Sequence, residues 1–209
     1  MEWPFFDLRV SCGEVLLRGV TDADLDPLLV VLPCDLEHDP RNERFAELDD
    51  GADRRRLFTA NLWKHRGTWS PASWCLELAV EVDGVVVGVQ ALEGDDFPLL
   101  RTVDSYSWLT AGVRGRGLAT SMRTGVLALA FDHLGAVAAV SSATLDNAPS
   151  LAVSRRLGYA DNGVSLIRTH AGAEQLQHLR LTRDRWLADP HDVTVTGMEA
   201  CLPWFGLTG

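Results

Sequence analysis

The 209-residue sequence has no long apolar run and no basic leader. Crossing a bilayer takes ~20 consecutive apolar residues, and no stretch approaches that length. The segment 1–7 carries acids where a secretory signal peptide needs positive charge. We therefore expect a soluble cytoplasmic protein that does not engage a membrane.

Cysteine is scarce, and histidine is scattered. With no Cys-x-x-Cys and no nearby histidine pair, the sequence predicts neither a disulfide framework nor a metal site, and favours reduced thiols. The four cysteines are Cys12, Cys34, Cys75 and Cys201. The histidines form no i, i+4 pair, so we expect surface or packing roles for His38, His65, His133, His170, His178 and His191.

Positive charge is also in short supply. There are 19 basic against 29 acidic residues, a formal net charge of −10, and the only lysine is Lys64. Such a surface does not attract phosphate backbones, so we expect no nucleic-acid partner and instead a cationic one. The heavy use of arginine and alanine is typical of bacterial genomes rich in G and C.

What is present is enough apolar sequence, 46%, for one domain spanning 1–209 with a sizeable core. Asp83-Gly84 between two strand-like runs predicts an antiparallel hairpin. A strand–helix–strand–helix pattern follows, so the fold class is α/β with a mixed sheet. We expect strands over 8–19, 74–82, 85–92, 101–113, 136–145, 164–169 and 176–182. We expect helices after Thr21 and over 53–69, 115–134 and 148–157, an acidic loop over 36–56, and a tail over 193–209 without clear assignment.

The most informative stretch, 113–120, reads Val-Arg-Gly-Arg-Gly-Leu-Ala-Thr at a junction between strand and helix. Glycines there let the chain turn tightly and present several backbone N–H groups beside the positive end of the helix dipole. This arrangement suits a phosphate or pyrophosphate. A Walker loop is excluded because no Gly-Lys is present. A dinucleotide loop is disfavoured, because Thr120 stands at its sixth position and the expected acid ~20 residues later is missing.

A third interpretation rests on a resemblance. The stretch 114–119, Arg-Gly-Arg-Gly-Leu-Ala, resembles the cofactor loop of the GCN5-related N-acyltransferases (GNAT superfamily). Upstream, 104–109 reads Asp-Ser-Tyr-Ser-Trp-Leu, and downstream 147–159 reads Asn-Ala-Pro-Ser-Leu-Ala-Val-Ser-Arg-Arg-Leu-Gly-Tyr. Both are similar to motifs of the RimJ/RimL-type branch, and the resemblance covers 8–186. It implies a mostly antiparallel sheet whose parallel pair splays at a coenzyme A (CoA) site, flanked by helices.

The resemblance also implies how acyl-CoA would be held. A pantetheine arm carries amides and can lie along a strand edge, here on peptide groups from Leu109 through Ala111 to Val113. Asn147 would bond the arm near its thiol. Arg116 and Arg156 are candidates for the outer phosphates, with exposed surface arginines as the alternative. The pyrophosphate would bind the amides that follow Arg114, namely those of Gly115, Arg116, Gly117, Leu118, Ala119 and Thr120.

Acyl transfer to an amine needs a base, a polarised carbonyl and a proton for the leaving thiolate. Asp104, where the branch usually has Glu, is the candidate base; this requires a desolvated site that raises its pKa, and the alternative is that it only orients the ammonium. Ser150 is the candidate donor to the thiolate, or else a helix cap. Tyr159 is expected to pack in the core. The N–H of Leu109 or Thr110 would polarise the carbonyl.

The function implied is an acyl-CoA-dependent N-acyltransferase that uses no metal. The donor is acetyl-CoA, or succinyl-CoA if Lys64, Arg66 or Arg101 receives a second carboxylate. The acceptor is a primary amine of a small molecule or a protein. An acyl-CoA-binding sensor or scaffold is the alternative, a nucleotide-dependent oxidoreductase is a third, and a homodimer is an open option. Acceptor-side aromatics that either line a pocket or pack in the core are Trp63, Trp69 and Trp74.

Overall fold

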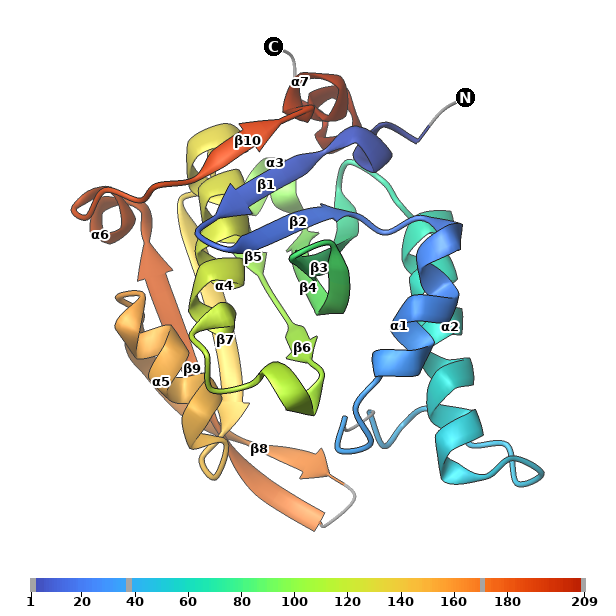
Figure 1. Cartoon of the computed structure of the whole chain (residues 1–209). Helices are drawn as coiled ribbons and strands as arrows, with labels where there is room; N and C mark the ends of the chain where they lie inside the picture. Colours follow the sequence, from blue (N-terminus) through green and yellow to red (C-terminus); the bar gives the residue numbers. More distant parts are fainter. Residues whose placement is uncertain (1–2, 37–38, 170–171, 208–209) are drawn as a thin grey trace.

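The computed structural model describes residues 3–36, 39–169 and 172–207, and within them the strands form one sheet. The strand order is β10-β1-β2-β3-β4-β5-β7-β9-β8, and β6 pairs with β4 beside this path (Figure 1). All pairs are antiparallel except β5 with β7. The strands are β1 Arg9–Cys12, β2 Val15–Gly19, β3 Ser73–Val82, β4 Val85–Asp95, β5 Thr102–Asp104, β6 Ser107–Leu109, β7 Ala138–Thr144, β8 Ala160–Thr169, β9 Gly172–Thr182 and β10 Thr194–Thr196.

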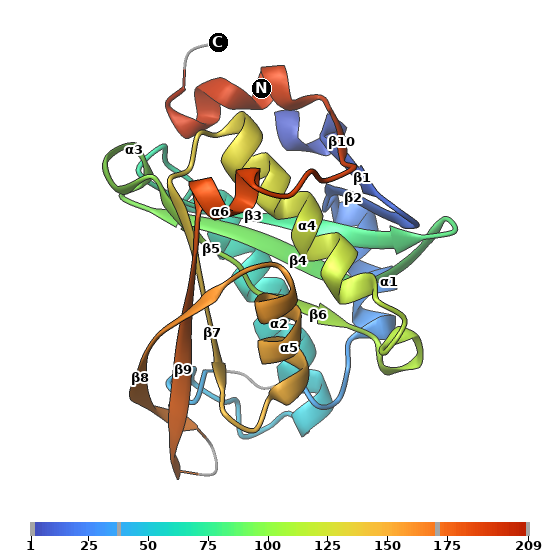
Figure 2. The same cartoon turned by 90° about the vertical axis from the view of Figure 1, so that its left-hand side faces the viewer.

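Helices cover both faces of the sheet. In Figure 2, α4 and α5 lie on the face nearer the viewer, and α2 lies behind the sheet. The larger core cluster forms under α4, and a smaller one joins α1 and α2 to the opposite face. The helices are α1 Leu25–Val31, α2 Asp50–Gly67, α3 Phe97–Leu100, α4 Leu118–Ala128, α5 Ala148–Arg156, α6 Arg183–Leu187 and α7 Met198–Cys201.

Strand alternation gives β3 two different faces. Leu76, Leu78 and Val80 belong to the core cluster under α4. Because successive side chains point to opposite faces, Glu77 and Ala79 face α2 instead, where Ala79 joins the smaller cluster. The sheet therefore carries an apolar core on one side, while the side toward α2 is apolar at one end only.

The predicted hairpin, the helix–strand–helix order after residue 115 and the mixed sheet are confirmed. Two single-strand predictions are wrong. Residues 8–19 form the β1–β2 hairpin, which turns at Gly13 with φ +59°. Residues 101–113 form two short strands followed by a 3₁₀ turn over Ala111–Val113. The long predicted helix begins at Leu118 as α4 and continues as a π-helical turn over Leu129–His133.

The break between β5 and β6 is a change of partner. β5 pairs with β7 at Thr102↔Ala138 and Val103↔Ala139, whereas β6 pairs with β4. Beyond Val103 the chain therefore leaves β7, and β6 and β7 diverge (Figure 1). A splayed pair leaves backbone groups of both strands without a ladder partner, which is where an extended ligand can bind.

The C-terminal tail, unassigned from sequence, closes one edge of the sheet. β10 pairs antiparallel with β1, and Phe205 is fully buried against the rings of Phe5, Trp69 and Trp74. The indole N–H of Trp69 donates to the carbonyl of Trp204 at 2.9 Å. Among the described helices, none combines the length and apolar character that crossing a membrane requires.

Candidate active site

The turn that precedes α4 presents backbone N–H groups. Gly115 and Gly117 have φ of +79° and +88°, a conformation in which a side chain is strained. Within the described chain, no acceptor bonds the five N–H groups of 115–119, whereas the N–H of Thr120 donates to the carbonyl of Gly117 at 2.9 Å. The predicted cradle therefore consists of five amides at the N-terminus of an 11-residue helix.

Arg114 holds this turn in place. Its Nε donates to the carbonyl of Leu109 at 2.9 Å, and its two terminal nitrogens form a fork on Asp35 at 2.5 and 2.8 Å. The guanidinium lowers the pKa of the Asp35 carboxyl. The Arg114 side chain is thus occupied within the protein, and its contribution to the turn is structural.

The other two predicted arginines lie at the surface. Arg116 donates to Glu14, in the β1–β2 turn, at 3.2 Å with both side chains about half exposed. Arg156 is exposed near the end of α5 and forms no ion pair with any described residue. Both cations remain available to a ligand at little cost, because an exposed ion pair contributes little.

Some backbone N–H and C=O groups of β6 and the residue after it bond to β4, and the others point toward the gap between β6 and β7. The N–H of Thr110 donates to the carbonyl of Val87 at 2.9 Å, which removes it as the carbonyl-polarising donor. In an antiparallel strand neighbouring residues point their N–H groups to opposite sides, so that of Leu109 faces away from β4. Of the two predicted donors, the geometry favours Leu109.

Asp104 forms a row with Glu93 on adjacent strands. The two are register partners across β4 and β5, so both side chains lie on the same face of the sheet. Asp104 accepts the N–H of Ser105 at 2.6 Å, yet burial raises the pKa of its carboxyl. The pKa of Glu93 is raised by burial and by the nearby Asp104 charge. The desolvation that a base at this position requires is therefore present.

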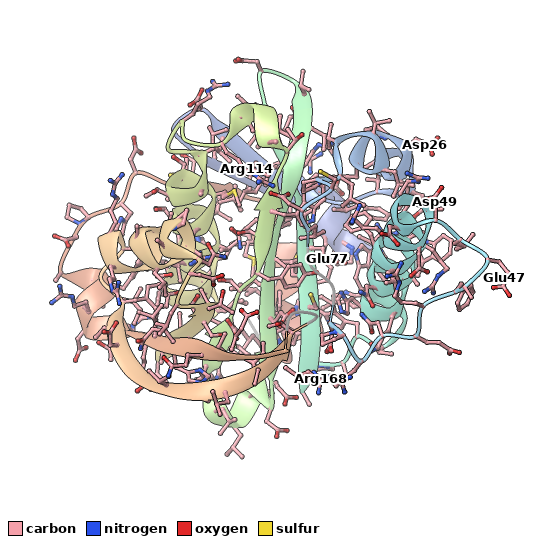
Figure 3. All side chains as sticks on the ribbon, turned by 90° about the horizontal axis from the view of Figure 1, so that it is seen from below. Asp26, Glu47, Asp49, Glu77, Arg114 and Arg168 are labelled. Carbon is pink, nitrogen blue, oxygen red and sulfur yellow. The ribbon has the colours of Figure 1, made fainter. Side chains whose placement is uncertain are left out.

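More polar side chains lie next to Glu93, on the face of the sheet that is turned toward α2. Cys75 is the register partner of Glu93, and its Sγ lies 3.6 Å from Glu93 Oε1. Tyr106 turns its hydroxyl inward and donates to Glu77 at 2.5 Å. His65 Nδ1, from α2, lies 3.4 Å from Glu77, and this carboxylate raises the pKa of His65. Figure 3 shows Glu77 in the interior beside α2, while Glu47 and Asp49 lie at the periphery.

Four of these side chains, His65, Cys75, Glu93 and Asp104, line a cavity of about 530 Å³ between α2 and the sheet. Glu77 lies next to it, 3.4 Å from His65. Lys64 and His65 contribute from α2, and Val140 contributes from β7 across the splay. Of the three cations predicted for a second carboxylate, only Lys64 lines this cavity: Arg66 pairs with Asp22, and Arg101 donates to the carbonyl of Leu134. The remaining lining residues are Thr68, Ser73, Trp74, Gly94, Asp95, Leu100, Thr102 and Val103.

Asn147 and Ser150 begin α5, next to the end of β7. Asn147 caps the helix, because its Oδ1 accepts the N–H of Ser150 at 3.2 Å. Its side-chain NH₂ group therefore points away from the cap and can donate elsewhere. Ser150 does not cap the helix, and its half-buried hydroxyl has no hydrogen-bond partner within the described residues.

A buried arginine lies beneath the splay. Arg123, on α4, is 6% exposed and donates to the hydroxyls of Ser154 at 2.7 Å and Ser141 at 3.5 Å. Burial lowers its pKa, and its charge acts on both Asp104 and Tyr159. Tyr159 is buried in the core cluster, as predicted.

Sequence reasoning missed the polar row of Glu77, Glu93, Cys75 and Tyr106 and the facing His65. The available signal was two acids next to apolar residues, Glu77 inside the first predicted hairpin strand and Glu93 directly after the second. Of the predicted tryptophans, Trp74 both lines the cavity and packs against Trp69, and Trp63 is 57% exposed. His38 and His170 lie outside the described residues.

A mixed sheet whose parallel pair splays beside an amide-rich turn is the architecture of an acyltransferase. The chain belongs to the Acetyltransferase (GNAT) domain family, whose model it matches over residues 14–160. The family predicted from the two motifs is therefore confirmed.

Solved structures of low sequence identity share the fold. Mycobacterium smegmatis RimJ in complex with CoA-disulfide aligns with a TM-score of 0.69 at 20% identity, over 90% of this chain and 97% of that one. A GCN5-related N-acetyltransferase from Brucella melitensis aligns with a TM-score of 0.66 at 20% identity, over 86% of this chain and 80% of that one. A chimera of the Vibrio cholerae spermidine N-acetyltransferase SpeG and hSSAT aligns with a TM-score of 0.65 at 12% identity, over 85% of this chain and 100% of that one.

Proposed function

We propose that this chain is an acyl-CoA-dependent N-acyltransferase that moves an acetyl or a succinyl group to a primary amine of a small molecule or a protein. The observation that carries the proposal is the set of five unbonded N–H groups over 115–119, directly after the strand that leaves β7. An unpaired row of donors at a helix N-terminus is suited to a pyrophosphate.

Residues on the α4 side would hold the donor. The amides of 115–119 bind the pyrophosphate. Arg116, within the turn, and Arg156, at the end of α5, are the candidate cations for the outer phosphates. The peptide groups of Leu109 and Ala111 lie along the splay, where a pantetheine arm can bind as an added strand. The side-chain NH₂ of Asn147 bonds the arm near its sulfur.

Residues on the α2 side would hold the acceptor. Glu93, Asp95 and Asp104 place three carboxylates around one cavity, against Lys64 and His65 as the cations, and Glu77 lies beside it at 3.4 Å from His65. This balance attracts an ammonium group and agrees with the acidic net charge of the chain. The acceptor is therefore an amine that arrives protonated.

The chemistry then divides among three groups. Asp104 takes a proton from the ammonium, directly or through a water, and its raised pKa makes it a better base than an ordinary aspartate. The neutral amine attacks the thioester carbon while the N–H of Leu109 stabilises the developing oxyanion. The C–S bond breaks, and Ser150 gives its hydroxyl proton to the departing thiolate. The attacking nitrogen loses its second proton through water, which returns one to Ser150, and Asp104 releases its proton to solvent.

The test is direct turnover. The purified protein is incubated with acetyl-CoA or succinyl-CoA and a panel of primary amines, while free CoA thiol and the mass of the acceptor are followed. We expect thiol release that depends on the amine, together with the matching acyl mass on it. CoA binding without turnover on any amine would instead support an acyl-CoA sensor, and stronger stabilisation by NAD than by CoA would overturn the proposal.

A further inference from the structure

Three metal-ligating side chains of different chemistry meet beside the cavity, and two of them, His65 and Cys75, form part of its wall. His65 comes from the C-terminal part of α2, and Cys75 and Glu77 come from the same face of β3. Their ligating atoms all lie within 4.8 Å of one another. His65 Nδ1 is buried and has no hydrogen-bond partner in the described chain, and it lies 3.4 Å from Glu77 Oε1. The ring nitrogen that a metal would use is thus already directed at a second ligand.

The donor set selects the kind of cation. One nitrogen, one thiol sulfur and one carboxylate oxygen suit Zn²⁺, whereas Mg²⁺ and Ca²⁺ prefer oxygen alone. Tetrahedral Zn²⁺ with bonds of about 2.0–2.3 Å requires the most distant pair of ligand atoms to close by about 1 Å. Side-chain rotation supplies that movement. Glu93 Oε1, 3.6 Å from Cys75 Sγ, is available as a fourth ligand, as is water from the cavity.

The surroundings favour a cation at this position. Glu93, Asp95 and Asp104 bring three carboxylates to the cavity and Glu77 adds a fourth beside His65, whereas Lys64 and His65 are the basic groups that line the same cavity. Tyr106 donates to Glu77 Oε1, the oxygen that also lies 3.4 Å from His65 Nδ1. A carboxylate oxygen has two lone pairs, so Oε1 keeps one for a metal, and Oε2 does not take part in that hydrogen bond. The cavity itself gives a hydrated ion a path to the ligands.

We propose that His65, Cys75 and Glu77 form a Zn²⁺-binding site in the acceptor cavity. On binding, the S–H bond of Cys75 breaks, its proton leaves to solvent and a Zn–S bond forms; no electrons are transferred. The sequence alone gave no metal signal, because the ligands lie on a helix and a strand whose proximity only the fold creates.

The site predicts antagonism between metal and amine. Zn²⁺ at Glu77 and Glu93 neutralises the carboxylates that would attract an ammonium group, so the two ligands exclude each other. Each ligand lowers the affinity for the other by the same factor. Acyl transfer by the enzyme is therefore inhibited by free Zn²⁺. This consequence rests on the proposed function, whereas the metal site does not.

The experiment uses Co²⁺ as a spectroscopic substitute on the full-length chain. We expect a near-ultraviolet sulfur-to-cobalt charge-transfer band, d–d bands typical of tetrahedral coordination, displacement by Zn²⁺, and release of a proton for each metal bound. Cys75→Ser removes the charge-transfer band and weakens Zn²⁺ affinity by at least ~10–100-fold. Cys34→Ser, at an exposed thiol outside the cavity, is the matched control and keeps both.

A second variant protects the test against a folding defect. His65→Asn lies on a partly exposed position of α2, and we expect a weaker Zn²⁺ affinity in a protein that still unfolds in one cooperative thermal transition. A cobalt band that survives Cys75→Ser, or that never appears in the wild type, overturns the metal site. Normal cobalt spectra in a protein without acyl transfer leave the site standing and refute the proposed function instead.

Discussion

Glu93 and Asp104 show how one cross-strand pair sets the chemistry at the residue scale. Each carboxyl has its pKa raised mainly by burial, and Asp104 also raises that of Glu93. Keeping two acids side by side without a bonded cation costs stability when both are charged. Carboxyls with pKa values perturbed in this way are enriched at functional sites, which makes the pair a candidate for function.

Glu93→Gln tests that cost through pH. In the unfolded chain Glu93 loses its proton near the ordinary glutamate pKa, while in the fold it holds the proton to higher pH. Between these values the folded state binds more protons, so the free energy of unfolding falls as pH rises. We expect the variant to be more stable than the wild type at pH 7 and equal to it at low pH, by urea unfolding across pH.

The control for that series is Glu47→Gln, on the exposed loop before α2. The difference in free energy of unfolding between Glu47→Gln and the wild type should not change with pH. If the stability gained by Glu93→Gln is also independent of pH, the explanation by a buried charge is wrong.

Ser150→Ala tests the proton donor. Because Asn147 already caps α5, removing the Ser150 hydroxyl leaves the helix start intact. We expect kcat to fall by roughly 10²-fold, the low end of general-acid contributions, with the Kd for CoA within a factor of about two. Steady-state kinetics and calorimetry measure these. Ser11→Ala, on the exposed face of β1, is the control, and an unchanged kcat in the Ser150 variant removes its role.

At the element scale, the turn into α4 is the part that the sequence described best. The pattern predicted a tight turn with exposed amides, and Gly115 and Gly117 have positive φ. Of the described amides of 115–120, only that of Thr120 is bonded inside the helix. The β1–β2 hairpin was missed although Gly13 marks it, because a short alternating run hides a turn. The division of 101–113 into β5 and β6 depends on the change of partner from β7 to β4, which no local pattern encodes.

Gly117→Glu tests the cradle. Open space surrounds the Gly117 Cα, but φ of +88° strains any side chain, and the added carboxylate repels phosphate. A ligand at 100 times its Kd stabilises by ~2.7 kcal/mol, which is roughly 5–10 °C for a chain of this size. We expect this CoA-induced shift in the wild type and none in the variant.

The matched control is Gly163→Glu in β8, where φ is +102° and the space is equally open. It carries the same strain and charge at a site away from the turn. A CoA shift that persists in Gly117→Glu, or disappears in both variants, would contradict the location of the cradle.

At the scale of the whole molecule, the two ends of the chain pack around one aromatic cluster. Trp3 and Phe5 contact Trp69, and Phe205 contacts both Trp69 and Trp74. Through Trp74 the cluster forms part of the cavity wall. The tail, which the sequence left unassigned because its contacts are distant in the chain, therefore supports the wall of the cavity.

Phe205→Ala measures that support. A fully buried phenylalanine replaced by alanine costs ~3–5 kcal/mol, and we expect a loss of that size in chemical unfolding. CoA affinity, measured below the unfolding transition, should stay within a factor of about two, because the cradle lies at the other end of α4. The control is Phe45→Ala, at an exposed ring, which should lower the free energy of unfolding by less than about 0.5 kcal/mol. If Phe205→Ala costs no more than this control, the tail adds no stability.

The aromatic cluster also equips the protein with its own optical reporter. The indole of Trp74 stacks at 5.8 Å on Trp69, which lies at 5.4 Å from Trp3, so excitation absorbed anywhere in the group passes between rings in contact. Whatever enters the cavity alters the polarity beside one of these fluorophores. Occupancy by an amine or a metal ion is therefore readable from intrinsic emission, without dye, label or coupled assay.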